Sequence, residues 1–249
     1  MDAAAYNSKT EKQKCELKMD VVPIVQSMFN KTTAYDAHLT LHGNGLEGVS
    51  YKTVRPIAER TDIYILLEQW AFGRSCRIVR EMIKNETKFD YLTVNISVRY
   101  LKSDRYIQDI KKILEGHGVP ADKICLEVSE KDLEADTEKI IGKLYELKKE
   151  GFMIAVDDYS GLYIPLSTLD SVPFDIIKID KDLSVNIQAD RKAEQTVRSI
   201  IEFAKGLNRE VIAKAVSDEK NKYMLIALGC EKIQGLANIN NQDDKCRIM

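Results

Sequence analysis

Short apolar segments recur along this chain, and each ends on a polar side chain. The polar ends are Asn95, Glu127, the neighbours Asp157 and Asp158, Lys178, and Lys214. β-Branched residues dominate the segments before them, and longer stretches with helical spacing of apolar residues separate one segment from the next. This alternation predicts a parallel sheet whose strands deliver their polar ends to one edge.

Period-2 and period-3.6 patterns place the individual elements. We expect strands at residues 20–25, 35–41, 91–96, 124–129, 153–158, 175–180, 210–216 and 231–235. We expect helices near 53–60, 64–84, 104–116, 134–150, 164–171, 191–207 and 218–228. In the stretch 191–207, Val197, Ile200, Ile201 and Ala204 follow three- and four-residue spacing, which gives one apolar helix face.

Eight strands with helices between most of them predict an α/β fold, a TIM-like (β/α)8 barrel. Only Gln26 to Ala34 separates the first two strands, which is too short for a packed crossover helix. This short link permits an antiparallel hairpin, so we expect an antiparallel strand near the start of the barrel. The alternative is an open doubly wound sheet, which would bind a ligand in a crevice instead of a barrel mouth.

The alternation of side chains along a strand predicts which way the polar residues at the strand ends point. Asn95, Glu127, Asp157 and Lys178 each point opposite to their apolar neighbours, so the four can face one shared mouth at the carboxyl ends of the strands. Carboxylate and amide oxygens are suitable ligands for divalent metal, and a nearby lysine can orient a water molecule. Lys214 departs from this pattern because it puts a cation where another anion is expected.

Composition excludes several classes of protein. The chain has 249 residues, a length that suits one large domain, and a formal net charge of −2, which gives no basic field for a nucleic acid polymer or an anionic membrane. No apolar run is long enough to span a bilayer. The five cysteines are scattered and lack CxxC spacing, which indicates reduced thiols and a cytoplasmic protein.

The two ends of the chain differ from the middle. Residues 1–18 are polar and lack periodicity, and we interpret them as a flexible N-terminal arm. Residues 19–237 hold all the predicted elements and form the barrel domain, and residues 238–249 form a polar C-terminal tail.

Two further motifs are weighed against simpler interpretations. Residues 43–48 fit GxGxxG after a predicted strand, but no helix opens on these glycines, so a flexible loop is favoured over a dinucleotide site. His38 and His42 have the spacing of helical zinc ligands, but they lie on a strand and its exit, where that spacing does not converge.

Seven short motifs follow one another along the chain. They are Val22-Pro23-Ile24-Val25, Arg55-Pro56-Ile57-Ala58-Glu59, Val94-Asn95-Ile96-Ser97, Leu126-Glu127-Val128-Ser129-Glu130, Val156-Asp157-Asp158-Tyr159, Ile177-Lys178-Ile179-Asp180, and Gly229-Cys230 with Gln234-Gly235. With these motifs the chain resembles, from about Val21 to Leu236, the EAL domain, a metal-dependent phosphodiesterase that opens cyclic di-GMP to linear pGpG. The resemblance implies the same TIM-like barrel with an antiparallel strand near its start.

The resemblance also implies roles for single residues. The implied metal ligands are Asp36, Asn95, Glu127, Asp157 and Asp158, the last as a second-metal ligand or bridge. Lys178 and Asp158 would be the catalytic residues, with Lys178 holding the attacking water, and Gln234 would bind ligand at the rim. The implied cofactor is Mg²⁺ or Mn²⁺, since two such ions can clamp the attacking and leaving oxygens of a phosphodiester.

Five positions depart from the family pattern. They are Val22, Asp36, Thr40, Lys214 and Ser217. Asp36 stands for the signature glutamate and is one methylene shorter, and Thr40 stands for an arginine that contacts the ligand phosphate. Lys214 replaces a glutamate, so its ammonium would repel metal and could pair with the neighbouring carboxylates.

Three functions remain open. The first is a degenerate EAL domain of bacterial cyclic di-GMP signalling that is catalytically impaired and regulates by binding a protein, with no cofactor. The second is a receptor that binds cyclic di-GMP without cleaving it. The third is a Mg²⁺- or Mn²⁺-dependent phosphodiesterase in which Asp36 still reaches the metal. The resemblance also makes a homodimer plausible, because the family often pairs through this barrel.

Overall fold

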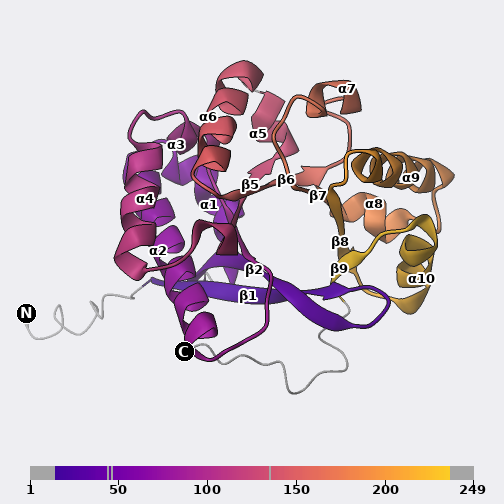
Figure 1. The fold of residues 1–249 in the computed structure, drawn as a ribbon, viewed down its shortest axis with the longest axis horizontal. Coiled ribbons are helices and arrows are strands. Elements are labelled where there is room, and N and C mark those ends of the chain that lie inside the picture. Colours follow the sequence, from indigo (N-terminus) through magenta and orange to yellow (C-terminus); the bar gives the residue numbers. More distant parts are fainter. Residues whose placement is uncertain (1–14, 44, 46, 135, 236–249) are drawn as a thin grey trace, which may run out of the picture.

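The computed structural model describes residues 15–43, 45, 47–134 and 136–235, and they form a closed barrel (Figure 1). The sheet order is β1-β9-β8-β7-β6-β5-β4-β2-β3, and an additional pairing of β1 with β2 closes it. The strands are β1 (Glu16–Gln26), β2 (Lys31–His42), β3 (Val49–Ser50), β4 (Leu92–Asn95), β5 (Ile124–Ser129), β6 (Met153–Tyr159), β7 (Ile176–Ile179), β8 (Glu210–Val216) and β9 (Lys232–Gly235). Since β3 pairs only with β2, the other eight strands make the wall, which confirms the TIM-like barrel and excludes the open sheet.

Helices surround the barrel on its outer side (Figure 1). They are α1 (Tyr51–Ala58), α2 (Ile63–Lys84), α3 (Val98–Leu101), α4 (Tyr106–His117), the 3₁₀ turn η1 (Ala121–Lys123), α5 (Glu130–Glu134), α6 (Thr137–Lys149), α7 (Leu166–Leu169), α8 (Lys181–Asn186), α9 (Arg191–Gly206) and α10 (Glu219–Leu228). The predicted helix 134–150 corresponds to α6, and the short helix α5 precedes it. The sequence missed α3, α5 and α8 because helices of four to six residues are too short to show an apolar period.

The first two strands form the expected hairpin. β1 runs antiparallel to β2 from the pair Glu16 and His42 to the pair Gln26 and Lys31, whereas β2 runs parallel to β4. β1 begins at Glu16, so the last residues of the segment 1–18 belong to a strand. The rest of the expected arm, residues 1–14, and the expected tail, residues 238–249, lie outside the described residues.

Two layers of side chains fill the barrel interior. The lower layer is apolar and consists of Ile24, Ala34, Tyr91, Cys125, Ala155, Ile176 and Ile212. Two residues further along the same strands, and therefore on the same inner face, come Asp36, Thr93, Glu127, Asp157, Lys178 and Lys214. The polar layer thus sits on an apolar floor at the carboxyl ends of the parallel strands, where such barrels carry their chemistry.

Two observations bear on the expected environment of the chain. Among the described helices, none has the length and apolar character that a membrane crossing needs. The described cysteines Cys15, Cys76, Cys125 and Cys230 are free thiols, as their spacing predicts.

Candidate functional site

An inner cluster of three charged side chains lies in the centre of the polar layer. Lys178 from β7 donates to Asp36 Oδ2 of β2 at 2.5 Å and to Glu127 Oε1 of β5 at 2.6 Å. All three side chains are at most 1% exposed. A single buried ammonium group therefore connects two carboxylates from strands on different parts of the barrel wall.

Asp36 is the most heavily bonded member of this inner cluster. Thr93 donates to its Oδ1 at 2.7 Å, Gln234 donates to Oδ2 at 2.9 Å, and His38 Nε2 lies 3.2 Å from Oδ2. Burial by itself would raise the pKa of Asp36, but Lys178 and His38 hold it well below its usual range. Asp36 is thus an ionised carboxylate whose oxygens are already engaged by protein donors.

Glu127 and Lys178 complete the electrostatics of the inner cluster. Burial and the negative charge of Asp36 raise the pKa of Glu127 despite the ammonium beside it. Burial would lower the pKa of Lys178, but the surrounding carboxylates raise it well above its ordinary value. Glu127 Oε2 is buried and has no hydrogen-bond partner among the described residues.

An outer cluster lies next to the inner one, nearer to solvent. Lys214 of β8 donates to Asp157 Oδ1 at 2.6 Å and also to Asp158 Oδ1. Lys52 of α1 donates to Asp157 Oδ2 at 2.6 Å and to Asp158 Oδ2 at 3.3 Å. Two ammonium groups therefore bridge the same two aspartates, which confirms the expectation that Lys214 pairs with neighbouring acids.

These contacts set the ionisation of the outer cluster. Burial would raise the pKa of Asp157, but Lys178, Lys214 and Lys52 together lower it. The pKa of Lys52 is raised, because Asp157 and Asp158 outweigh the effect of its burial. Asp157 is therefore ionised and Lys52 protonated around neutral pH.

Backbone irregularities bring both aspartates to the mouth. The pairing of β6 with β7 shifts between Val156 and Tyr159, and the pairing of β8 with β9 shifts between Ala213 and Val216. Asp158 and Ala215 have φ angles of 53° and 54°, within these two bulges. A bulge re-aims the side chain that follows it, so Asp158 contacts the same lysines as Asp157 instead of pointing to the opposite face.

A glycine permits the bulge of β8. Gly235 has a φ of 139°, and a Cβ there would lie 2.3 Å from the carbonyl oxygen of Val216. Only glycine fits this close approach of β9 to β8.

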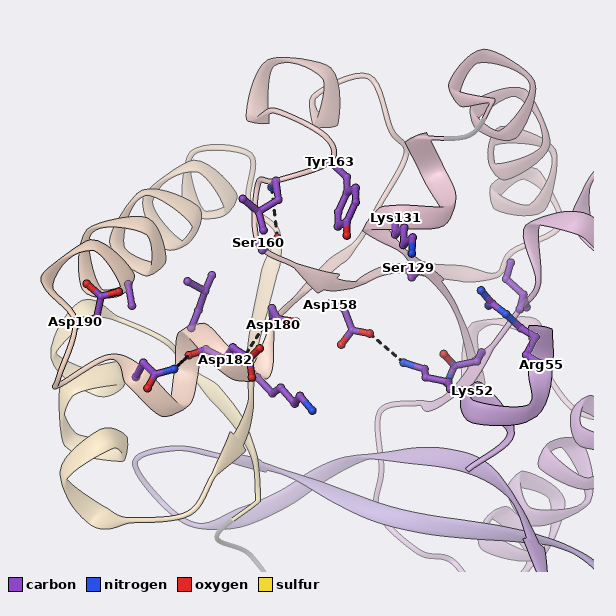
Figure 2. Close-up of a pocket in the computed structure, with 17 residues that line it drawn as sticks. Lys52, Arg55, Ser129, Lys131, Asp158, Ser160, Tyr163, Asp180, Asp182 and Asp190 are labelled. Atoms are coloured by element: carbon purple, nitrogen blue, oxygen red, sulfur yellow. Dashed lines mark hydrogen bonds and ion pairs between the residues drawn. The ribbon is translucent and has the colours of Figure 1, made fainter. Parts of the chain in front are cut away.

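A pocket of about 570 Å³ opens at the mouth above the outer cluster (Figure 2). Cationic residues Lys52, Arg55 and Lys131 lie on one side, and the acidic residues Asp180, Asp182 and Asp190 lie on the other (Figure 2). Lys181 lies between Asp180 and Asp182 in the chain and also lines the pocket, so one wall is cationic and the other carries three aspartates and one lysine. Its volume is within the range of small-ligand sites.

One wall of this pocket is fixed by Glu130 at the start of α5. Its carboxylate accepts hydrogen bonds from the backbone N–H groups of Ser160, Tyr163 and Ile164 and from the Ser160 hydroxyl. The loop after the paired aspartates thus has a defined anchor in the carboxylate of Glu130.

Glu68 of α2 is a buried carboxyl group that forms no ion pair among the described residues. It is 8% exposed and accepts a hydrogen bond from Ser97 N–H at 3.1 Å, while its other oxygen has no partner among the described residues. Burial raises the pKa of Glu68 to about 8. Glu68 shares a small cavity with Tyr51, Lys52 and Asn95, and no sequence motif pointed to it.

The donor set can be compared with what a divalent ion needs. Four carboxylates, those of Asp36, Glu127, Asp157 and Asp158, contact three ammonium groups. Both oxygens of Asp157 and of Asp158 accept from lysine, and Mg²⁺ or Mn²⁺ would need several of these oxygens. In this arrangement the residues do not fit a metal centre on Asp157 and Asp158.

The remaining residues singled out from the sequence lie at different distances from the clusters. Asn95 lines the mouth pocket, and Gln234 contacts Asp36. Thr40 bonds to His42 and to the Lys18 carbonyl, so it lies apart from the carboxylates. Val22 pairs in register with Asp36, and Ser217 is exposed after β8.

Each histidine of the pair considered for zinc has its own partners. His38 contacts Asp36, whereas His42 contacts Thr40 and Glu47. The two rings therefore do not share a site, as the strand geometry predicts. Residues 44 and 46 of the GxGxxG stretch lie outside the described residues.

Lys52 is the functional-site residue that sequence reasoning missed. It lies in the first turn of α1, after the N-cap Ser50, and 105 residues separate it from Asp157. No pattern near Lys52 links it to a strand end. The excess of carboxylates over lysines among the predicted strand ends was the one available signal that a further cation was needed.

Comparisons with known proteins agree with this fold. The family model described as "EAL domain" matches residues 7–239. The signaling protein YkoW of Bacillus subtilis is 31% identical over 183 residues, which are 72% of this chain and 22% of that protein. The chain therefore spans about a fifth of the length of this relative.

Two solved structures have the same fold. The structure titled "PaMucR Phosphodiesterase, c-di-GMP complex" has a TM-score of 0.83 and 22% identity, and covers 89% of this chain and 90% of that one. A manganese and cyclic di-GMP complex of Klebsiella pneumoniae BlrP1 has a TM-score of 0.76 and 19% identity, and covers 91% of this chain and 56% of that one.

Proposed function

The chain belongs to the EAL domain family, and we propose that it is a catalytically impaired member that acts in cyclic di-GMP signalling by binding a protein. The observation that carries this proposal is the double lysine bridge. Lys214 and Lys52 engage both carboxylate oxygens of Asp157 and of Asp158, the residues for which the resemblance implies metal ligation.

Charge explains why these lysines oppose metal binding. An ammonium group about 4 Å from an ion costs about 4 kcal/mol per unit of ionic charge at an effective dielectric constant of 20. A divalent ion would have to displace both lysines or bear this repulsion twice. A two-metal mechanism needs the complete oxygen set, so partial retention of ligands does not by itself supply the reaction.

The direct test is hydrolysis. The purified chain is incubated with cyclic di-GMP and either Mg²⁺ or Mn²⁺, and linear pGpG is measured by chromatography. We expect no product above the protein-free control. Turnover by the unaltered chain would refute the proposal and favour the third function, a phosphodiesterase built on the retained Asn95, Glu127, Asp157, Asp158, Lys178 and Gln234.

A gain-of-binding test addresses the lysine bridge itself. We expect the double variant Lys52→Ala/Lys214→Glu to bind Mn²⁺ in calorimetry, whereas the unaltered chain does not. The matched control is Lys181→Glu, which alters an exposed lysine that lines the same pocket and has no ion pair among the described residues. Equal Mn²⁺ binding by the unaltered chain and the double variant would remove the physical basis of the proposal.

The second candidate function is a receptor for cyclic di-GMP. The observation that favours it is the mouth pocket of about 570 Å³, one wall of which carries Lys52, Arg55 and Lys131 as partners for phosphate. Calorimetry with cyclic di-GMP, with and without Mn²⁺, separates the candidates. Tight binding without product supports the receptor, and no binding leaves the protein-binding role.

Three smaller expectations belong to the same proposal. They are a barrel domain that extends to residue 237 and starts at Glu16, where β1 begins, instead of at residue 19; a homodimer; and a cytoplasmic location. Sedimentation velocity measures the mass of the assembly, and limited proteolysis with mass spectrometry measures the domain bounds.

A further inference from the structure

A groove of about 680 Å³ lies on the outside of the barrel, away from the mouth pocket. Its walls are the first residues of β1, Glu16–Asp20, and His117 at the end of α4. Its floor is the outer face of α2, with Trp70, Gly73, Arg74 and Arg77. None of these residues belongs to the inner or the outer cluster.

One wall of this groove is a strand edge. β1 pairs with β2 along its whole length, but with β9 only at Val25 and Gln26. Within the part of the chain that the structure describes, Glu16–Ile24 therefore have a strand partner on one side only. An unpaired edge offers backbone N–H and C=O groups to an added strand.

The floor of the groove is cationic and aromatic. Arg74 and Arg77 have no ion pair among the described residues, whereas Lys18 on the wall is paired with Glu16 at 3.4 Å. Trp70 is 38% exposed, and Leu66, one helical turn before it, is 65% exposed. Gly73 leaves the floor open between Trp70 and Arg77, which lie on the same helix face.

We propose that this groove binds an extended acidic segment of another protein, which adds a strand to the free edge of β1 and places carboxylates on Arg74 and Arg77. Arg74 and Arg77 are separated by about 4.5 Å along the helix axis and alternate side chains of a strand by about 6.8 Å, a difference that two long arginine side chains can span. This inference does not rest on the proposed function, because the groove is separate from the carboxylate clusters.

Trp70 makes the test direct because it is the only tryptophan in the chain. The probe is an octapeptide of alternating Glu and Val, titrated into the full chain while tryptophan fluorescence is recorded. We expect a saturable change that weakens as NaCl rises. Two control peptides are expected to bind at least tenfold more weakly. One is an octapeptide of alternating Lys and Val, which tests charge. The other is the Glu-Val peptide with alternate backbone nitrogens methylated, which tests backbone hydrogen bonding.

Matched variants locate the contact. Arg74→Gln/Arg77→Gln is expected to weaken the Glu-Val peptide about tenfold or more, which is about 1.4 kcal/mol. Arg80→Gln is the control, because Arg80 is exposed on the same helix but does not line the groove, and it is expected to change nothing. Circular dichroism verifies that both variants are folded.

Several results would overturn the inference. The first is the absence of a saturable fluorescence change. The second is a Lys-Val peptide that binds as tightly as the Glu-Val peptide. The third is a methylated peptide that binds as tightly as the unmethylated one, which would mean that charge acts without strand pairing. A peptide-free fluorescence change that depends on protein concentration would instead make a second copy of the chain the occupant of the groove, and would overturn it too.

Discussion

The inner and outer clusters contain the same chemical groups in different surroundings. In the inner cluster, Lys178 is 1% exposed and holds Asp36 and Glu127. In the outer cluster, Lys214 is 16% exposed and Lys52 is 41% exposed, and they hold Asp157 and Asp158. The inner cluster is cut off from solvent by the barrel wall, whereas the outer one opens on the mouth pocket.

Because of this difference in burial, we expect the inner cluster to matter most for stability and the outer cluster to matter most for the chemistry at the mouth. A buried ion pair that loses one partner leaves an uncompensated buried charge. Removing one member of the inner cluster should therefore lower the free energy of unfolding strongly. The outer cluster is partly exposed, since Lys52 is 41% and Asp158 39% exposed although Asp157 is only 2% exposed, and water screens such ion pairs more than fully buried ones. The outer cluster can therefore change its residues, as the lysine at position 214 illustrates, while the fold persists.

The largest effect is expected from breaking the inner cluster. Lys178→Met leaves Asp36 and Glu127 buried without their cation, and the free energy of unfolding should fall by about 3–5 kcal/mol. Urea unfolding followed by circular dichroism measures it. Adding Asp36→Asn and Glu127→Gln to the same variant should recover much of the loss. If Lys178→Met is as stable as the unaltered chain, the inner cluster does not contribute to stability as we infer.

Glu68 is a third case, a buried carboxyl group that forms no ion pair among the described residues. Its pKa of about 8 in the folded chain, against 4.5 as the ordinary value, means that the folded state keeps a proton that the unfolded state loses. Its contribution to stability is therefore present below pH 4.5 and falls as the pH rises towards 8, by about 3–4 kcal/mol between pH 5 and 8.

Urea unfolding at several pH values, with Glu68→Gln beside the unaltered chain, measures this slope. The variant should lack the loss between pH 5 and 8. The lysine-paired carboxylates Asp36 and Asp157 behave oppositely: their lowered pKa values preserve stability until the pH falls below 3.8. Parallel curves for the variant and the unaltered chain would show that Glu68 is not the group that titrates.

Removal of Lys214 tests the outer cluster from its more buried side. Lys214→Met should lower the free energy of unfolding by only about 1–2 kcal/mol, because Lys52 continues to neutralise both aspartates. Thermal and urea unfolding of the variant give the value. A loss as large as that of Lys178→Met would mean that the two clusters are energetically equivalent.

The smallest effect is expected at Lys52. Lys52→Met should cost about 0.2–1 kcal/mol, because an exposed ion pair is largely screened. In 1 M NaCl this cost should shrink, while the cost of Lys178→Met should not. Double-variant cycles at low and high salt compare the two lysines, and equal salt dependence would contradict the distinction between the clusters.

Much of the fold could be predicted because it depends on local patterns. The run Ile154 to Val156 and the period of helix α9 are visible in the sequence, and the short link after Gln26 leaves no room for a crossover helix. Strand alternation also placed Glu127, Asp157 and Lys178 on inward positions. These inferences use only the geometry of single strands and helices.

The details of the site could not be predicted in the same way. Alternation would turn Asp158 away from Asp157, and only the bulge in β6 turns it to the same lysines. Lys52 reaches the site from a helix that no motif connected with it. The unpartnered carboxyl oxygen of Glu68 depends on how α2 packs on the barrel, and the sequence carries no sign of this packing.

The barrel, its antiparallel start and the charged strand ends could be inferred from the chain because periodicity and turn length act over a few residues, and the seven motifs indicated the family. Which cation meets which anion depended on how the chain folds. Coulomb interactions depend on distance and on burial, and both are set by strand register, bulges and closure of the barrel. The charge of Lys214 was therefore evident from the chain, whereas its pairing with two aspartates, shared with Lys52, was a result of folding.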